Sequence, residues 1–398
     1  MIDSIYIALS GMLGHERGLN VIGNNVTNMN TLGFRGSTVN FSDVFLGTAP
    51  NGTDGSSQQQ RGVGGGVDSS HTMVDFKPGL PQNTGNDLDV FLQGDGFFIV
   101  QDESGAIRYT RAGSFEVVDD TLMLKGQKIK VMTRDASGQL QPITLKDLQV
   151  NAGKPTSKFA LTGNFLTNDT DFSIDSFDVF DKNGNKHTLK LAFTFHKHQS
   201  TDNPGAFDIW RLSASEQGQE IGTGDLQFLS GIPQQSPLSL HLALTGADPI
   251  DASVDFSGVQ IQSLGQQDSN VTAAGQDGFA VGQITAKTFD EKGVLKLTYS
   301  NAQKADGPKL ALAQVIDPAA LVQVGDALFE YRGQQPVTIR EAGDDLKVEA
   351  RQLEGSNVDL TTEFSQLILM QRGYQASSQV ISTANDMLQE LFDLRGRR

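Results

Sequence analysis

Three short stretches of the sequence contain residue types that could bind a ligand or catalyse a reaction. The first, GVGGGV at residues 62–67, has the glycine content of a phosphate-binding loop. Such a loop also needs a preceding strand and a following Lys-Ser/Thr pair, because backbone N–H groups, lysine and hydroxyl act together on the phosphates. No convincing strand precedes this stretch and the pair is missing, so its composition favours a flexible loop.

The second stretch, HKH, holds His196 and His198 two residues apart. In a strand both imidazoles would lie on one face and could share a metal ion. No third ligand is evident nearby, which favours two exposed histidines at the end of a strand. We therefore expect no metal site here.

The third stretch, DLD, holds Asp87 and Asp89, with Asp95 beyond, in the spacing of paired carboxylates for acid–base catalysis. Nothing supplies a matching nucleophile, and Asp residues beside glycine are common in turns. The Gly-x-Ser-x-Gly and His-Glu-x-x-His motifs are both absent. The sequence therefore predicts neither an enzyme nor a cofactor site.

Composition excludes further classes of function. The net charge of −16 and the lack of a basic stripe argue against nucleic-acid binding, and no small-molecule substrate is indicated. The chain has no cysteine, which excludes disulfides and thiolate metal sites. No apolar run approaches the ~20 residues that span a bilayer. The first residues, MIDSIYIALSGML, lack the basic region of a signal peptide, so we expect a cytoplasmic chain or one exported without a cleaved leader.

Both ends of the chain have the periodicity of long helices. Residues 2 to about 28 carry four apolar residues seven apart, and the C-terminal segment carries five, which predicts a continuous apolar seam on each helix. The four glycines of the first helix each cost up to ~1 kcal/mol relative to alanine, so it should need a partner. The seam residues are Ile5, Met12, Leu19 and Val26 in the first helix, and Leu360, Leu367, Tyr374, Ile381 and Leu388 in the second.

The second helix has more apolar surface than the first can cover. Residues 358–394 would extend for roughly 55 Å and the N-terminal helix for about 40 Å, at ~1.5 Å per residue. A two-helix hairpin cannot bury both apolar flanks of the longer helix, so self-assembly with other chains is predicted, with a discrete helical oligomer as the alternative. The second apolar row consists of Phe364, Ile368, Met370, Ala384, Leu391 and Phe392.

The residues between the helices have the alternation and frequent turns of β-structure. We therefore predict a mainly β protein with paired terminal α-helices, in which nested, discontinuous β-domains stand on a coiled-coil-like helical base. The expected domains are a terminal helical assembly domain (1–30 with 358–398), a connecting loop region (31–70), an inner β-domain (71–145 with 285–357) and an outer β-domain (146–284). Residues 48–70 are expected to be a mobile tether or a brace between subunits.

Five stretches resemble the bacterial flagellar rod and hook family. They occur in the family's order and cover both termini and the inner β-domain, whereas the middle block matches no motif. The stretches are ALSGM at 8–12, NNVTNMNTLGFRG at 24–36, TGNDLDVFLQGDGFFIV at 84–100, YTRAGSF at 109–115 and LEGSNVDLTTEFSQLILMQRGYQASSQVISTANDML at 353–388.

The resemblance implies a structural subunit rather than an enzyme. An insertion of about 140 residues at 146–284 resembles hook-type members of the family, whereas distal-rod-type members lack it. Hook-type members imply a flexible tubular homopolymer of the extracellular hook, which joins rod to filament and transmits motor torque. The implied partners are further copies of the chain, a distal rod protein, a hook cap protein, a hook–filament junction protein and the flagellar type III export apparatus, which exports the chain without cleaving a signal peptide.

Two alternatives remain at this point. One is a distal-rod-type subunit of the same family. The other is a secreted β-rich adhesin that its terminal helices oligomerise. The chain's single tryptophan and five tyrosines argue against a sugar-binding platform, which usually stacks aromatic rings.

Overall fold

The computed structural model describes residues 2–46, 63–166, 168–198, 207–262, 268–343 and 345–396. It is mainly β-structure with one long helix at each end of the chain, as the sequence predicts. The chain forms two compact units, the first made of Met1–Lys146, Lys287–Lys296 and Asp306–Arg398, and the second of Asp147–Ala286 and Leu297–Ala305. Among the described helices, none is long and apolar enough to cross a membrane.

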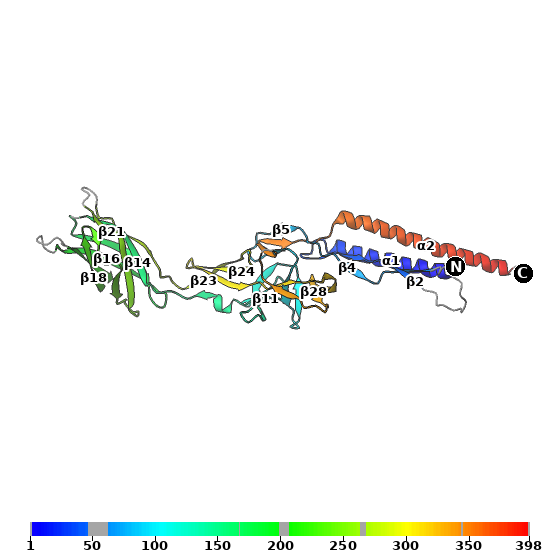
Figure 1. Cartoon of the computed structure of the whole chain (residues 1–398), viewed down its shortest axis with the longest axis horizontal. Coiled ribbons are helices and arrows are strands. Elements are labelled where there is room, and N and C mark those ends of the chain that lie inside the picture. Colours follow the sequence, from blue (N-terminus) through cyan, green and yellow to red (C-terminus); the bar gives the residue numbers. More distant parts are fainter. Residues whose placement is uncertain are drawn as a thin grey trace, which may run out of the picture. The chain divides into compact units, whose positions relative to one another are not determined.

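The first unit contains both helices, α1 (Ile2–Thr27) and α2 (Leu360–Gly396), which lie side by side (Figure 1). Its largest sheet follows the order β27-β28-β8-β7-β11-β10-β9, and β12, β26 and β29 pair with strands of that sheet. Short two-stranded pairs, β1-β4, β2-β3, β6-β30 and β5-β31, join this sheet region to the helices.

The strands of the first unit are β1 (Ser37–Val39), β2 (Ser42–Leu46), β3 (Val63–Asp68), β4 (Thr72–Val74), β5 (Pro81–Asn83), β6 (Val90–Gln93), β7 (Phe97–Gln101), β8 (Ile107–Thr110), β9 (Phe115–Val118), β10 (Thr121–Leu124), β11 (Lys130–Arg134), β12 (Leu140–Pro142), β26 (Leu312–Gln314), β27 (Leu321–Gly325), β28 (Leu328–Tyr331), β29 (Thr338–Arg340), β30 (Lys347–Ala350) and β31 (Gln352–Glu354). Two single-turn 3₁₀ helices, Lys146–Leu148 and Pro318–Ala320, also occur in the chain. A further four-stranded sheet has the order β13 (Val150–Asn151), β23 (Gly282–Phe289), β24 (Val294–Tyr299) and β25 (Lys304–Lys309).

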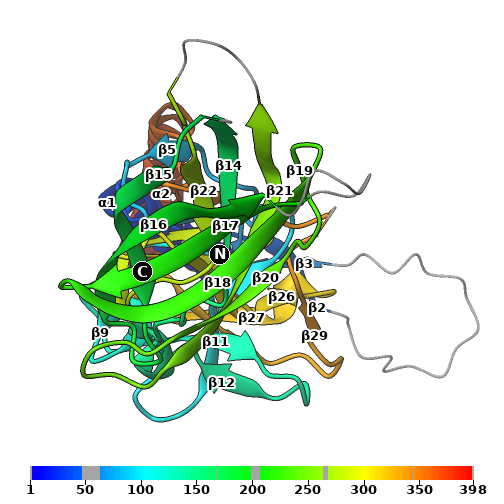
Figure 2. The same cartoon turned by 90° about the vertical axis from the view of Figure 1, so that its left-hand side faces the viewer.

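The second unit is a β-sandwich. One sheet has the order β20-β21-β14-β22 and the other β15-β16-β17-β18-β19; β16, β17 and β18 run side by side in Figure 2. Alternating side chains of both sheets form one apolar core, in which Phe165 stacks on the buried Trp210 at a centroid distance of 4.4 Å. Its strands are β14 (Lys158–Leu166), β15 (Asp171–Phe180), β16 (Lys186–His198), β17 (Phe207–Glu216), β18 (Gln219–Leu229), β19 (Ile232–Pro233), β20 (Leu238–Leu242), β21 (Ile250–Gln262) and β22 (Thr272–Gln276).

Asp277 connects the two chain segments that enter and leave this sandwich. Its carboxylate accepts hydrogen bonds from Lys154 Nζ at 2.9 Å, from Ser157 N and Oγ at 2.8 and 2.7 Å, and from Lys158 N at 2.8 Å. Burial acts to raise the pKa of Asp277, but these donors outweigh it and hold the pKa well below its ordinary value. The carboxylate therefore stabilises the folded unit above the ordinary pKa of aspartate, and that contribution is lost as the pH falls through the lowered value.

We expect Asp277→Asn to destabilise the second unit by about 1.5–3 kcal/mol at neutral pH, because hydrogen bonds to a charged group are lost. The difference from the unchanged chain should shrink as the pH falls below about 4. Fluorescence of Trp210, the single tryptophan, can follow this unfolding. Asp248→Asn is the control, since Asp248 only makes an exposed 3.6 Å ion pair with Lys182. Equal behaviour of the two variants would contradict the role given to Asp277.

The expected connecting loop region, 31–70, is more ordered than its composition predicts. It contains β1, β2 and β3, and the strand β3 includes most of the GVGGGV stretch. The physical reason is the neighbouring helix: a Cβ added at Gly66 would lie 2.3 Å from Ser10 Oγ of α1, so only glycine lets this strand lie so close. Residues 48–62 of the loop expected at 48–70 lie outside the described residues.

Candidate assembly interface

The two terminal helices form an antiparallel pair with a regular register. Gly11 faces Ser377, Gly18 faces Met370, and Asn25 contacts Glu363, so the matched positions advance by seven residues in both helices. Residues seven apart lie on one face of a helix, and the contact is therefore a single continuous stripe. On α1 this stripe consists of Ala8, Gly11, His15, Gly18, Ile22 and Asn25; on α2 it consists of Glu363, Met370, Gly373, Ser377 and Ala384.

Glycine determines how closely these helices approach. A Cβ at Gly18 would lie 2.8 Å from Sδ of Met370, and a Cβ at Gly373 would lie 2.4 Å from the ring of His15. Both separations are shorter than real Cβ contacts, so each glycine accommodates a large side chain of the other helix. The glycines that weaken α1 as an isolated helix are thus the residues that fit it to α2.

The predicted apolar seams do not form the centre of this contact. Ile5, Met12, Leu19 and Val26 are half-buried along one flank of the contact stripe of α1, and Leu360, Leu367, Ile381 and Leu388 are half-buried on α2. The seams therefore lie beside the centre of the contact, which small residues occupy, and their role in assembly stays a prediction. Met370 and Ala384, which the sequence placed in the second apolar row, face α1 instead.

Several large apolar side chains of the helix pair remain exposed. Of the predicted assembly residues, Tyr374 is 38% exposed, and Phe364, Leu391 and Phe392 are 52%, 51% and 67% exposed. Sequence reasoning missed an apolar group on α1, where Tyr6 and Leu13 are 65% and 53% exposed beside Leu9. Positions 6, 9 and 13 are three and four residues apart and so lie on one face of a helix, which is a pattern that the sequence alone shows.

The hairpin of β2 and β3 covers another face of α1. Ser10 Oγ accepts a hydrogen bond from Val67 N at 3.1 Å, and Arg17 Nη1 donates to Ser69 O at 2.7 Å. A Cβ at Gly14 would lie 2.9 Å from the ring of Phe41. The first helix is thus held between α2 and this hairpin.

A buried polar junction holds α1, α2 and β1 together. The side chain of Asn25 donates to Ser37 O at 2.8 Å and to Glu363 Oε1 at 3.0 Å, and accepts from Ser37 N at 2.9 Å. Burial raises the pKa of Glu363, and its Oε2 has no hydrogen-bond partner among the described residues. Asn25 therefore fixes the end of α1 both to the following strand and to the first turns of α2.

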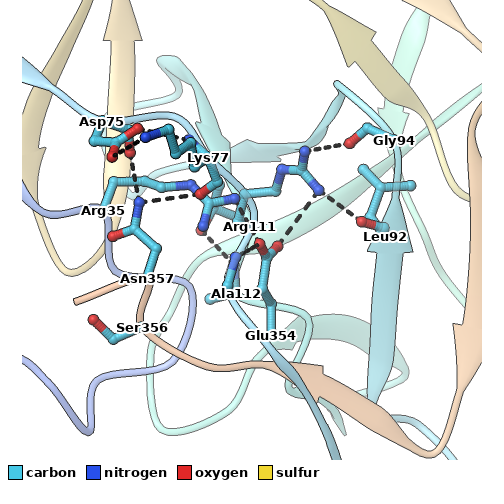
Figure 3. A network of polar contacts seen from close by, with 12 residues as sticks. Arg35, Asp75, Lys77, Leu92, Gly94, Arg111, Ala112, Glu354, Ser356 and Asn357 are labelled. Carbon is cyan, nitrogen blue, oxygen red and sulfur yellow. Dashed lines mark hydrogen bonds and ion pairs between the residues drawn. The ribbon is translucent and has the colours of Figure 1, made fainter. Parts of the chain in front are cut away.

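A buried ion cluster, which we call the hub, lies where the helices join the sheet region (Figure 3). Arg35 and Glu354 are fully buried and form an ion pair with Nη2 to Oε1 at 2.6 Å. Glu354 also accepts from Gly79 N at 2.8 Å and lies 3.4 Å from Arg111 Nη1. One carboxylate thus serves two buried guanidinium groups.

Arg111 connects the hub to the sheet region. Its Nη1 donates to Leu92 O at 2.6 Å, and its Nη2 donates to Gly94 O. Burial lowers the pKa of Arg111 to about 10, although the charge of Glu354 acts in the opposite direction. The guanidinium stays protonated at neutral pH, so the hub remains charged.

Asn357 completes the connection next to the hub. Its Oδ1 accepts from Gly36 N at 2.8 Å, while Nδ2 donates to the carbonyl oxygens of Asp75 at 2.7 Å and Lys77 at 3.0 Å. The segment before α2 is thereby tied to the segment after α1 and to the strand region after β4. Neither the hub nor this asparagine was among the residues predicted from the sequence.

Of the residues that the sequence offered for chemistry, Asp87 and Asp89 have structural roles, and the side chain of His198 lies outside what the structure describes. Asp89 is buried and accepts from Thr84 Oγ1 at 2.6 Å and Asn86 Nδ2 at 3.0 Å, and Asp87 pairs with Arg351 at 2.7 Å. Asp95 and His196 are exposed. Across the described ranges, no three His, Asp or Glu side chains are grouped so that they could hold a metal ion.

Three family models match the chain in the order of the sequence. Residues 5–35 match "Flagella basal body rod protein", residues 91–153 match "Flagellar hook protein FlgE/F/G D1 domain", and residues 350–394 match "Flagellar basal body rod FlgEFG protein C-terminal". The flagellar hook protein FlgE of Borreliella burgdorferi is 29% identical over 99% of this chain and 100% of its own length. The chain belongs to the flagellar hook protein family.

A second curated relative and a solved structure are also similar to the chain. FlgE of Salmonella typhimurium is 28% identical over 98% of this chain and 99% of its own length. The solved structure of Helicobacter pylori flagellar hook protein FlgE2 is 12% identical, with a TM-score of 0.47, and covers 69% of this chain and 100% of that one. Membership of the flagellar hook protein family places the chain in the bacterial flagellum, in its extracellular hook.

The hub takes one residue from each segment that matches the flagellar models. Arg35 lies in residues 5–35, Arg111 in residues 91–153 and Glu354 in residues 350–394. The segments that define the hook family are therefore connected through a single carboxylate. This contact gives a physical reason why three distant parts of the sequence carry the resemblance.

Proposed function

We propose that this chain is the structural subunit of the flagellar hook and polymerises with itself into a flexible tube that joins rod to filament and transmits motor torque. The observation that carries the proposal is the uncovered apolar surface of the helix pair, which includes Tyr6, Leu13, Phe364, Leu391 and Phe392. Burying one such side chain contributes roughly 1.5–3 kcal/mol. Copies of the chain gain that free energy when their helix pairs pack together.

The predicted assembly residues take part in this packing as two groups. Ile5, Met12, Leu19, Val26, Leu360, Leu367, Ile381 and Leu388 line the flank of the helix contact, and Tyr374, Phe364, Leu391 and Phe392 extend outward. The half-buried group is positioned to become fully buried between neighbouring helix pairs. We assign no catalytic step to the chain, and its further partners are a distal rod protein, a hook cap protein, a hook–filament junction protein and the type III export apparatus.

The two units suit a tube that bends. Each has its own apolar core, so each can move as a rigid body without repacking its interior. The hub and Asn25 make the helix pair part of the first unit, so that force on the helices passes directly to the sheet region. Within the first unit, we keep the division into a helical assembly domain and an inner β-domain as part of this proposal.

A pair of matched variants tests the assembly role. We expect Tyr6→Ser with Leu13→Ser to raise the concentration needed for polymerisation at least tenfold, because two exposed apolar groups are lost. Glu16→Ser with Asn20→Ser, further along the exposed side of α1, should leave polymerisation unchanged. Sedimentation and electron microscopy of the purified chain measure both. A discrete oligomer in place of tubes would favour the adhesin alternative and contradict the hook proposal.

A further inference from the structure

The contact stripe of α2 continues beyond its partner helix. Glu363, Met370, Ser377 and Ala384 follow one another at intervals of seven, and the next position in the series is Leu391. In the register of the pair, Ile2 at the start of α1 lies opposite position 386 of α2. Ala384 is therefore 2% exposed, whereas Leu391 is 51% exposed on the same face.

These last turns of α2, residues 387–392, which we call the overhang, have the apolar character of an interface. Phe392 is 67% exposed and Met387 46% exposed, and Leu388 lies between them on the contact side. A helix that presents this much apolar surface to water is unfavourable unless something covers it. Because the overhang continues an interface between helices, a helix is the shape that fits it.

A matching apolar patch occurs at the other end of α2. Phe364, Ile368 and Leu369 in its first turns are 52%, 51% and 66% exposed. Between the two ends, α2 exposes polar residues such as Gln371, Gln375 and Gln379, with Tyr374 and Val380 as the large apolar side chains among them. A polymer built from identical copies that all point the same way requires two different surfaces that fit each other. The two ends of α2 supply such a pair.

We propose that the overhang of one copy packs on the first turns of α2 in the next copy along the polymer. Copies that point in the same direction bring these two ends together, because the overhang projects past α1 and the next copy presents the start of its α2 there. Ile368 of one patch and Phe392 of the other are 24 residues apart, or roughly 36 Å along the helix. This inference rests on the proposed function and names the surfaces through which axial neighbours meet.

Substitution of the overhang tests the proposal. We expect Leu391→Ser with Phe392→Ser to raise the polymerisation concentration at least tenfold while the monomer keeps its helical circular dichroism. Gln389→Ser is the matched control, since Gln389 lies in the same turns but is polar and exposed on another face. Unchanged polymerisation of the double variant would overturn the inference and leave the proposed function standing. An unchanged chain that never polymerises would overturn the proposed function and this inference with it.

Disulfide trapping identifies the partner surface. The chain has no cysteine, so Ile368→Cys combined with Phe392→Cys introduces the only two thiols. Within one copy they are roughly 36 Å apart on one helix, far beyond the ~7 Å that a disulfide can bridge between Cα atoms. We expect oxidation of the polymer to give a ladder of linked copies. Gln375→Cys with Phe392→Cys should give no ladder, and the opposite result for the two pairs would overturn the inference.

Discussion

Glu354→Leu is expected to lower the free energy of unfolding of the first unit by about 3–5 kcal/mol, because the buried guanidinium groups of Arg35 and Arg111 lose the carboxylate that they share. Arg35 would lose the ion-pair partner that it has among the described residues, and Gly79 N would lose its acceptor. Hydrogen exchange of the β6 and β7 amides measures the loss. The fluorescence of Trp210 should not change, since that residue belongs to the second unit.

Two further variants show whether charge causes the effect. Asp87→Leu breaks an exposed ion pair with Arg351 and should cost at most about 1 kcal/mol. Adding Arg35→Met to Glu354→Leu should recover part of the lost stability, because one uncompensated charge is removed with its partner. If Glu354→Leu cost no more than Asp87→Leu, the hub would have no special role.

Gly18→Leu is expected to force α1 away from α2 and to prevent polymerisation. The new side chain would occupy the space of Met370, whose Sδ is 2.8 Å from the position of a Cβ, and overpacking of this kind costs about 1–3 kcal/mol. Circular dichroism should show a loss of helix, and sedimentation a loss of polymer.

Gly23→Leu is the matched control for this substitution. It places the same side chain five residues further along α1, where a Cβ has no heavy atom within 4 Å. Since leucine is a better helix former than glycine, this variant should gain up to ~1 kcal/mol of helix stability and still polymerise. Equal behaviour of the two variants would show that close approach of the helices is not required.

Much of the fold could be predicted because its signals are local. The helical periodicity of the apolar residues predicted both helices nearly to their ends, and the alternation of apolar and polar residues predicted the β-structure between them. The centre of the helix contact could not be found in the same way. A search for large apolar side chains selects Met12 and Leu367, whereas the contact itself uses Gly11, Gly18 and Gly373, which such a search counts as interruptions.

The hub was missed for a different reason. Arg35 and Glu354 are 319 positions apart, and Arg111 and Glu354 are 243 apart, so no local pattern joins them. Their one sequence signal is that each is a charged residue in a short motif that carries the family resemblance. The strand β3 was missed because glycine usually indicates a loop, and here it allows a strand to lie against a helix.

The position of the hub residues in the sequence also bears on the order in which parts of the chain can fold. The sandwich of the second unit is nearly continuous in sequence and many of its contacts join neighbouring hairpins, so it can form early. The hub needs Glu354, which follows almost all of the chain, and it closes a loop of 319 positions; the contact of Asn25 with Glu363 closes one of 338. A subunit that lacks Glu354 and α2, or in which the hub has not yet closed, would therefore lack a helix pair that is anchored to the sheet region. We therefore expect the chain to become able to join the polymer only after the hub has closed, so that copies with an unformed hub would not add to a growing tube.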